Sequence, residues 1–362
     1  MPSLSANPAP NGGVEGFLSF NHTLDLDDKR YIVRRVVRLS DGRSVAAYKI
    51  EFSSRMTQQP CTVFPADDAL FSSFNFSVDG EDHPFTSQVN VAPDAEGEGY
   101  RLSWLAPLRP WSEFDRYCVP FVVNINGGAA FYACFRLFGT LEPGSTRLTE
   151  LQTEGIIGWN VAASYDDLFV WAEAPPEDLM STRIGAWTPS AGVHSLGPSV
   201  RGRVCRLALG PTRLAGTMSD LPLQGCWEDI PDQIRFWHLG RAEGNAGVLK
   251  SSPPIEHRVF QQRMAVGDSY LAMGVFYFSD DPLKDNQEFI LLARLSDWKI
   301  RWLKASPGNR FRDYAIAIVG DSLYFTEGPK NWGAAVARTL YRYDLASRFD
   351  TLGTEEPFPV SP

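Results

Sequence analysis

Arg310-Phe-Arg-Asp-Tyr-Ala-Ile-Ala-Ile-Val-Gly-Asp-Ser-Leu-Tyr-Phe325 holds two short apolar runs on either side of a Gly-Asp-Ser turn. The runs Tyr314 to Val319 and Leu323 to Phe325 are rich in residues that favour strands, and Gly320-Asp321 is a turn signal. This pattern predicts a buried hairpin. Further along, Leu340 to Asp344 alternates with period two, as a more exposed outer strand would.

The same order of strand, turn, strand and outer strand recurs upstream. Three copies are read at Arg263 to Leu271 with Phe289 to Leu295, at Asn160 to Val170 with Thr182 to Trp187, and at Arg203 to Leu214 with Gln233 to Trp237. Self-similarity at roughly forty to fifty residues, with about four short strands in each unit, is typical of a β-propeller. One blade cannot bury its own faces, whereas neighbours stacked around an axis can.

The N-terminal third adds weaker units to this pattern. Lys29 to Leu39 and Ser44 to Phe52 flank a Ser-Asp-Gly-Arg turn, which predicts a hairpin in the outer half of a first blade. Further units are read at Val63 to Phe71 with Tyr100 to Leu105, and at Asp115 to Val123 with Ala130 to Phe138. We therefore predict an all-β fold, a single propeller of about seven (five to seven) four-stranded blades. Residues 1–13 are expected to be a flexible leader and residues 14–362 the propeller domain.

Composition restricts the partners and the compartment. The formal net charge of −9 argues against a nucleic-acid surface, because phosphate binding needs a basic face. No apolar stretch approaches the length of a membrane helix, and residues 1–13 contain no signal-peptide core. The five cysteines are scattered and odd in number, which favours free thiols and a cytoplasmic location. The five histidines include no close-spaced pair, so no metal site is expected. No Gly-rich phosphate motif is present, and no other cofactor is expected.

Gly320-Asp321-Ser322-Leu323 resembles the nucleophile motif of the GDSL hydrolases. In that family the serine lies near the N-terminus and an Asp-x-x-His pair follows far downstream, whereas here the last histidine is His257. A serine without a base to accept its proton is a poor nucleophile. The same Gly-Asp-Ser sequence begins at Gly267, so a repeated turn is the preferred interpretation.

Charged and aromatic residues recur where the innermost strand of each blade begins. In a propeller these positions surround one mouth of the central channel, and guanidinium groups that converge there would repel one another unless an anion or an electron-rich oxygen lay between them. The alternative is that the arginines form salt bridges between neighbouring blades. The expected catalytic residues are Arg312, Arg203, His257 and Tyr314, and the expected substrate-binding residues are Trp159, Asn160, Arg116, Tyr117, Arg258 and Asp313.

Such a mouth offers hydrogen-bond donors and aromatic walls, but no evident nucleophile, metal site or nucleotide loop. It suits an enzyme that binds one organic molecule and catalyses ring formation by orientation and electrostatics. In size, leader and architecture the chain is similar to the propeller-type cyclases of fungal natural-product pathways, including hetero-Diels–Alderases. That resemblance implies a small-molecule substrate, no cofactor and a role in secondary metabolism.

Two other classes of function remain open from the sequence. One is a propeller that binds a glycan or a protein through exposed loops and tryptophans such as Trp332. The other is a propeller hydrolase or lyase that uses Asp115, His257 or Asp313 as its base.

Overall fold

The computed structural model describes the greater part of the chain. The described residues are 3–8, 14–26, 29–51, 59–66, 69–78, 81–90, 101–104, 121–125, 129–134, 137–141, 149–151, 156–165, 168–188, 190–197, 199–219, 233–239, 246–251, 259–277, 287–329 and 339–354. In part of the strands the description is limited to the backbone.

The described strands form seven antiparallel sheets, which we number as blades in chain order. Blade 1 contains β1 (Ser3–Pro8), β2 (Val14–Leu26), β3 (Lys29–Arg38) and β4 (Ser44–Glu51). Blade 2 contains β5 (Gln59–Ala66), β6 (Ala69–Val78), β7 (Glu81–Asn90) and β8 (Arg101–Trp104). Blade 3 contains β9 (Phe121–Ile125), β10 (Ala129–Cys134), β11 (Leu137–Leu141) and β12 (Thr149–Leu151). Blade 4 contains β13 (Ile156–Tyr165), β14 (Leu168–Ala174), β15 (Ser181–Thr188) and β16 (Gly192–Ser195), with β17 (Val200–Arg201) also paired to β15.

The C-terminal half continues the series. Blade 5 contains β18 (Arg203–Leu209), β19 (Arg213–Ser219), β20 (Gln233–Leu239) and β21 (Ala246–Ser251). Blade 6 contains β22 (Val259–Val266), β23 (Tyr270–Tyr277), β24 (Gln287–Arg294) and β25 (Ile300–Lys304). Blade 7 contains β26 (Asn309–Val319), β27 (Ser322–Pro329) and β28 (Thr339–Asp344). The short helix α1 (Leu345–Arg348) and the 3-10 turn η2 (Phe349–Thr351) follow.

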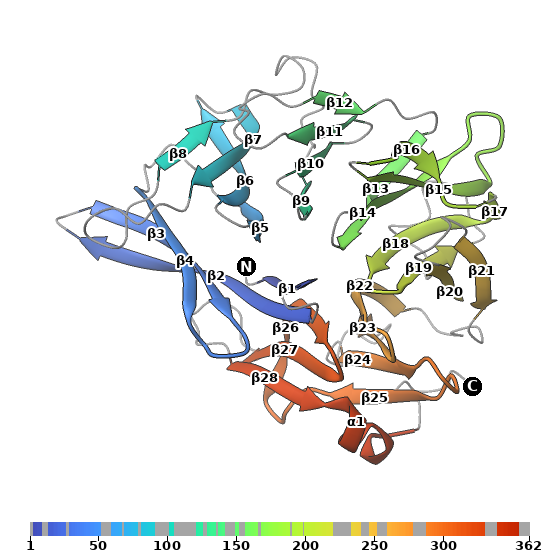
Figure 1. Ribbon diagram of the computed structural model, residues 1–362. Coiled ribbons are helices and arrows are strands. Elements are labelled where there is room, and N and C mark those ends of the chain that lie inside the picture. The colour runs from blue at the N-terminus through green and yellow to red at the C-terminus, as the bar shows by residue number, and fades with distance from the viewer. Residues whose placement is uncertain are drawn as a thin grey trace.

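The blades surround a central axis, with the first strand of each blade innermost (Figure 1). The fold is therefore an all-β propeller, as the repeats predict. The hairpin expected around Gly320 is β26 and β27, and Leu340 to Asp344 forms the outer strand β28. Five of the seven described sheets have the expected four strands, whereas blade 4 has a fifth short strand, β17, and three strands are described in blade 7.

The N-terminal segment differs from the sequence expectation. Ser3–Pro8 was expected to be part of a flexible leader, but it forms β1 and pairs antiparallel with β2 from Ser3↔Ser19 to Pro8↔Val14. The sequence shows little sign of this strand because all its residues except Leu4 are small, polar or proline. Its backbone hydrogen bonds to β2 and the contact of Leu4 with blade 7 hold it in place.

The core consists of apolar layers between neighbouring blades. In β24, Phe289, Leu291 and Ala293 pack toward blade 5, while Ile290 and Leu292 pack toward blade 7. Successive side chains of a strand point to opposite faces, so a strand buried on both faces reads as one continuous apolar run. That is why this strand lacks the alternation of an outer strand.

The ring closes through packing between its first and last blades. Leu4 of β1 lies in one apolar cluster with Ala315, Ala317 and Tyr324 of blade 7, and β1 contacts β26 directly. Neither blade contributes a described strand to the other blade's sheet.

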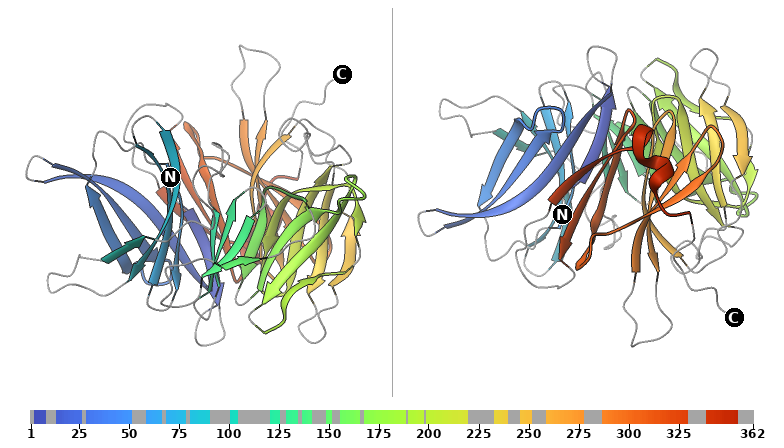
Figure 2. Two further views of the ribbon diagram at one scale, coloured as in Figure 1. Left: turned by 90° about the horizontal axis from the view of Figure 1, so that it is seen from above. Right: turned by 90° about the horizontal axis from the view of Figure 1, so that it is seen from below.

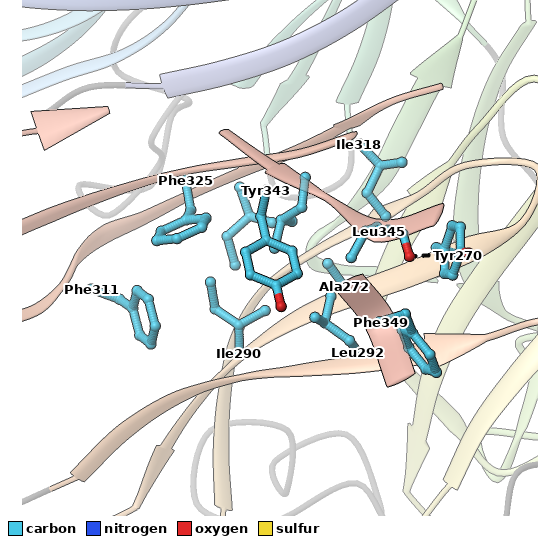
Figure 3. Close-up of a cluster of buried hydrophobic side chains, with 12 residues drawn as sticks. Tyr270, Ala272, Ile290, Leu292, Phe311, Ile318, Phe325, Tyr343, Leu345 and Phe349 are labelled. Atoms are coloured by element: carbon cyan, nitrogen blue, oxygen red, sulfur yellow. Dashed lines mark hydrogen bonds between the residues drawn. The ribbon is translucent and has the colours of Figure 1, made fainter. Parts of the chain in front are cut away.

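The segment after blade 7, residues 345–354, lies on the outside of the ring (Figure 2) and contacts blade 6. Phe349 is 1% exposed, its ring centroid lies 5.5 Å from that of Tyr270, and the guanidinium of Arg294 lies over it. The hydroxyl of Tyr270 donates to the carbonyl oxygen of Leu345 at 3.4 Å (Figure 3). Trp302 of β25 bridges to Gly353. This C-terminal clasp therefore ties blade 7 to blade 6.

Cys205, in β18, is disulfide-bonded. For this residue the expectation of a free thiol is wrong. In the described part of the chain no helix is long and apolar enough to cross a membrane.

Candidate pocket at the hairpin end of the channel

Five of the ten predicted site residues lie in two innermost strands. Trp159 and Asn160 are in β13, and Arg312, Asp313 and Tyr314 are in β26. In both strands the pairing register shifts across these residues, between Ile157 and Ala162 and between Phe311 and Ile316 respectively. Such irregularities re-aim side chains and are frequent beside functional sites. The backbone therefore gives the two groups equivalent positions in blades 4 and 7.

Four other predicted site residues, Arg116, Tyr117, His257 and Arg258, lie outside the described residues. The expected convergence of guanidinium and aromatic groups at that mouth therefore stays a prediction.

Arg203 is the one predicted site residue with a described side chain. It begins β18, is 5% exposed, and donates from Nη1 to the carbonyl oxygen of Leu179 at 3.0 Å. Leu179 lies between β14 and β15, in the preceding blade. Burial lowers the pKa of the Arg203 guanidinium. The contact joins blades 4 and 5 through a backbone carbonyl, whereas the inter-blade alternative expected a salt bridge.

Arg310, the second residue of the innermost strand of blade 7, also contacts the preceding blade, here through an ion pair. Its Nη1 lies 3.9 Å from Oε1 of Glu288, at the start of β24 in the preceding blade. Both described arginines at this end of the channel therefore contact the blade before their own.

The opposite end of the channel, where the innermost strands turn into the second strands, contains a pocket of about 280 Å³. Five blades contribute to it: 1, 4, 5, 6 and 7. Its described lining residues are Ala6, Val14, Tyr165, Leu209, Pro211, Val266, Gly267, Asp268, Ser269, Ile318, Gly320 and Asp321.

This hairpin pocket has an apolar interior and an acidic rim. Leu209 and Val266 end their innermost strands and Ile318 is the residue before the last of its own, while Asp268 and Asp321 occupy the turns of blades 6 and 7. Thr212 Oγ1 donates to Oδ1 of Asp268 at 2.6 Å. Both aspartates are exposed. Among the described residues, no donor contacts the carboxylate of Asp321. The charged groups among the described lining residues are thus both carboxylates.

Glycines let the turns of neighbouring blades approach closely. A Cβ on Gly267 would lie 2.7 Å from Cγ2 of Ile318 in blade 7, and a Cβ on Gly210 would overlap the carbonyl oxygen of Val266 in blade 6. Gly320 has a φ of +56°, which L side chains rarely adopt. Glycine is therefore favoured at these turn positions, at Gly267 because the neighbouring blade lies close and at Gly320 because of its backbone conformation.

Ser322 of the GDSL-like sequence has a structural position. It begins β27, is 8% exposed, and its Oγ accepts a hydrogen bond from Nε of Arg342 at 3.1 Å. The structure agrees with the repeated-turn interpretation. The sequence held one signal for the pocket that was not used, namely that Gly267-Asp268 and Gly320-Asp321 end the innermost strands of adjacent blades and so must meet at one end of the channel.

Across the residues with a described environment, no group of three or more His, Cys, Asp or Glu side chains is placed to hold a metal ion.

No protein-family model and no curated protein matches the sequence. Among solved structures, the complex of KlAtg21 with the coiled-coil of AgAtg16 has a TM-score of 0.55 at 9% identity, over 88% of this chain and 96% of that one. A prolyl endopeptidase structure has a TM-score of 0.51 at 11% identity, over 80% of this chain and 41% of that one. Puromycin hydrolase has a TM-score of 0.50 at 11% identity, over 96% of this chain and 52% of that one.

These likenesses concern the fold. This chain spans about half of the length of the two hydrolases, at 41% and 52%.

Proposed function

We propose that this propeller binds a small organic molecule in the hairpin pocket, with an amine or another organic cation of the ligand beside Asp268 and Asp321. The observation that carries the proposal is the convergence of five blades on one cavity with an apolar interior and two carboxylates at its rim. Ligand pockets typically combine apolar walls with a few polar groups that fix orientation. At about 280 Å³ the cavity suits a compact ligand.

The two carboxylates would have different roles in binding. Asp268 is oriented by Thr212, so its remaining oxygen presents a fixed acceptor. Asp321 has no described donor of its own, so a ligand cation would supply one. A hydrogen bond between a cation and a carboxylate is stronger than a neutral one.

Benzylamine is a suitable first probe because it combines an aromatic ring with one ammonium group, and benzyl alcohol has the same shape without the charge. We expect calorimetry to detect benzylamine binding to the full chain. D321N should weaken that binding by about tenfold, the effect of losing one charge-assisted hydrogen bond. D41N removes a carboxylate from the β3–β4 turn and should change nothing. Equal binding of benzylamine and benzyl alcohol, or an unchanged affinity in both D321N and D268N, would rule out this pocket as a cation site.

Hydrolysis by a propeller enzyme is the second candidate. Two solved structures of similar fold are hydrolases by name, and a carboxylate without a described partner, such as Asp321, is a candidate base for activating water. The test is turnover of aminoacyl-naphthylamides by the full chain. Loss of turnover in D321N with an unchanged melting temperature would support this role.

Ring formation at the opposite mouth remains a prediction from the sequence. None of the three similar structures is a cyclase by name, and Arg203 is bound to a backbone carbonyl. Replacing Arg312 or Tyr314 would test it through the turnover of a cyclisation substrate.

A further inference from the structure

Tyr165 ends the innermost strand of blade 4 at the mouth that contains the hairpin pocket, and it lines that pocket. It pairs with Leu168, the first residue of the second strand. The corresponding residues of blades 5 and 6 are Leu209 and Val266, which also line the pocket. Of the seven described innermost strands, β13 is the one that ends in an aromatic residue.

The position of Tyr165 in the strand places it toward blade 5. Ala163, two residues earlier, packs against the apolar cluster between blades 4 and 5, and so does Leu168. Alternate residues of a strand share a face, and cross-strand partners point to the same side. Leu209 packs against the same cluster from blade 5. Tyr165 and Leu209 therefore form an aromatic and aliphatic wall of the pocket where blades 4 and 5 meet.

The acidic groups of the pocket come from other blades. Asp268 belongs to the turn of blade 6 and Asp321 to the turn of blade 7. Blades 4 and 7 are three places apart in a ring of seven, which is the largest separation that such a ring allows (Figure 1). A ligand with its ring on Tyr165 and its cation at Asp321 would therefore lie across the pocket.

We propose that Tyr165 makes the hairpin pocket selective for aromatic cations, through contact between its ring and the aromatic ring of the ligand. This inference rests on the proposed function, because it names the class of ligand for the same pocket. Offset-stacked and edge-to-face aromatic pairs contribute about two- to tenfold in affinity beyond the area that they bury. Tyr165 is 8% exposed, and a side chain that the protein already holds loses little conformational freedom on binding.

The test compares benzylamine with cyclohexylmethylamine, which carries the same ammonium group on a saturated ring. Both are cations at neutral pH, so the two carboxylates interact with them alike. We expect calorimetry on the full chain to give benzylamine the higher affinity, by about two- to tenfold. Equal affinities, or tighter binding of cyclohexylmethylamine, overturn the inference without the use of any variant.

Variants at position 165 test whether the preference comes from this ring. Y165F keeps the ring and should keep the preference, whereas Y165L should bind the two amines with nearly equal affinity. Y165I, whose branched side chain suits a strand, replaces Y165L if that variant fails to fold. Y341L is the matched control, because Tyr341 lies in the outer strand of blade 7 and stacks on Phe325 with 5.4 Å between ring centroids. A preference that survives in Y165L, or that disappears in Y165F or Y341L, contradicts the assignment to Tyr165.

D321N separates the failure of this inference from the failure of the proposed function. If both amines bind equally and D321N weakens both, the pocket is a cation site without aromatic selectivity, so only the inference is overturned. If benzylamine binds no more tightly than benzyl alcohol, no cation is recognised and both are overturned.

Discussion

Thr212 in the inner turn of blade 5 donates a 2.6 Å hydrogen bond to Asp268 in the inner turn of blade 6. The two residues are 56 positions apart in the sequence and meet because their turns end neighbouring innermost strands. The bond both joins two blades and orients a carboxylate at the rim of the hairpin pocket. We expect T212V to lower the free energy of unfolding by about 1 kcal/mol, the usual net value of one hydrogen bond. Urea denaturation measures it, T212S is the matched control, and equal stability of T212V and the parent would contradict the expectation.

Gly210 and Val266 lie in contact across the same pair of blades. A Cβ at position 210 would overlap the carbonyl oxygen of Val266, and backbone cannot move aside as a side chain can. G210A should therefore cost about 1–3 kcal/mol of stability, the usual range for overpacking. G353A is the matched control, since its Cβ would lie an ordinary 3.8 Å from the carbonyl oxygen of Trp302. Similar midpoints of urea unfolding for the two variants would refute the close approach.

Phe349 anchors the C-terminal clasp on blade 6. Its ring lies beneath the guanidinium of Arg294 at 4.9 Å and near that of Arg301 at 5.4 Å, and it packs beside Tyr270. F349A should lower the free energy of unfolding by about 3–5 kcal/mol, because a fully buried aromatic side chain is lost. L340A is the control, because Leu340 is 36% exposed and its loss should stay within about 0.5 kcal/mol. If F349A lowered the free energy of unfolding only slightly, packing of the clasp on blade 6 would not stabilise the fold.

Arg294 makes the stability of this region dependent on acid pH. Its hydrogen bonds hold the pKa of Asp297 and of Asp350 below the ordinary aspartate value. A carboxyl whose pKa is lower in the folded state contributes stability above its unfolded pKa, about 4, and loses it as the pH falls through the folded value. Melting temperatures measured from neutral pH downward should therefore fall below about pH 4, and they should fall less steeply in D297N/D350N.

D321N is the control for this titration, since no described salt bridge involves Asp321. A parent and a D297N/D350N variant with parallel acid profiles would show that these ion pairs do not contribute to the acid dependence.

The strands of the later blades and their order follow from local sequence. The runs 314–319 and 289–295 are apolar and end at turn signals, and the side-chain period of a strand is fixed by its backbone. The repeat of this unit was enough to predict the propeller. Ser3–Pro8 was missed because a strand that is held by its neighbour's backbone needs no apolar pattern of its own.

Which groups meet across the ring was decided by the tertiary structure. Leu179 accepts from Arg203, Val266 approaches Gly210, and Phe349 lies against Arg294, and none of these pairs follows from local periodicity. The same holds for the mouth of the channel that contains the pocket, because its lining comes from five blades. A single strand encodes which of its faces is apolar, but the stacking angle and register of separate blades set the distances between their side chains, and these depend on every inter-blade contact at once.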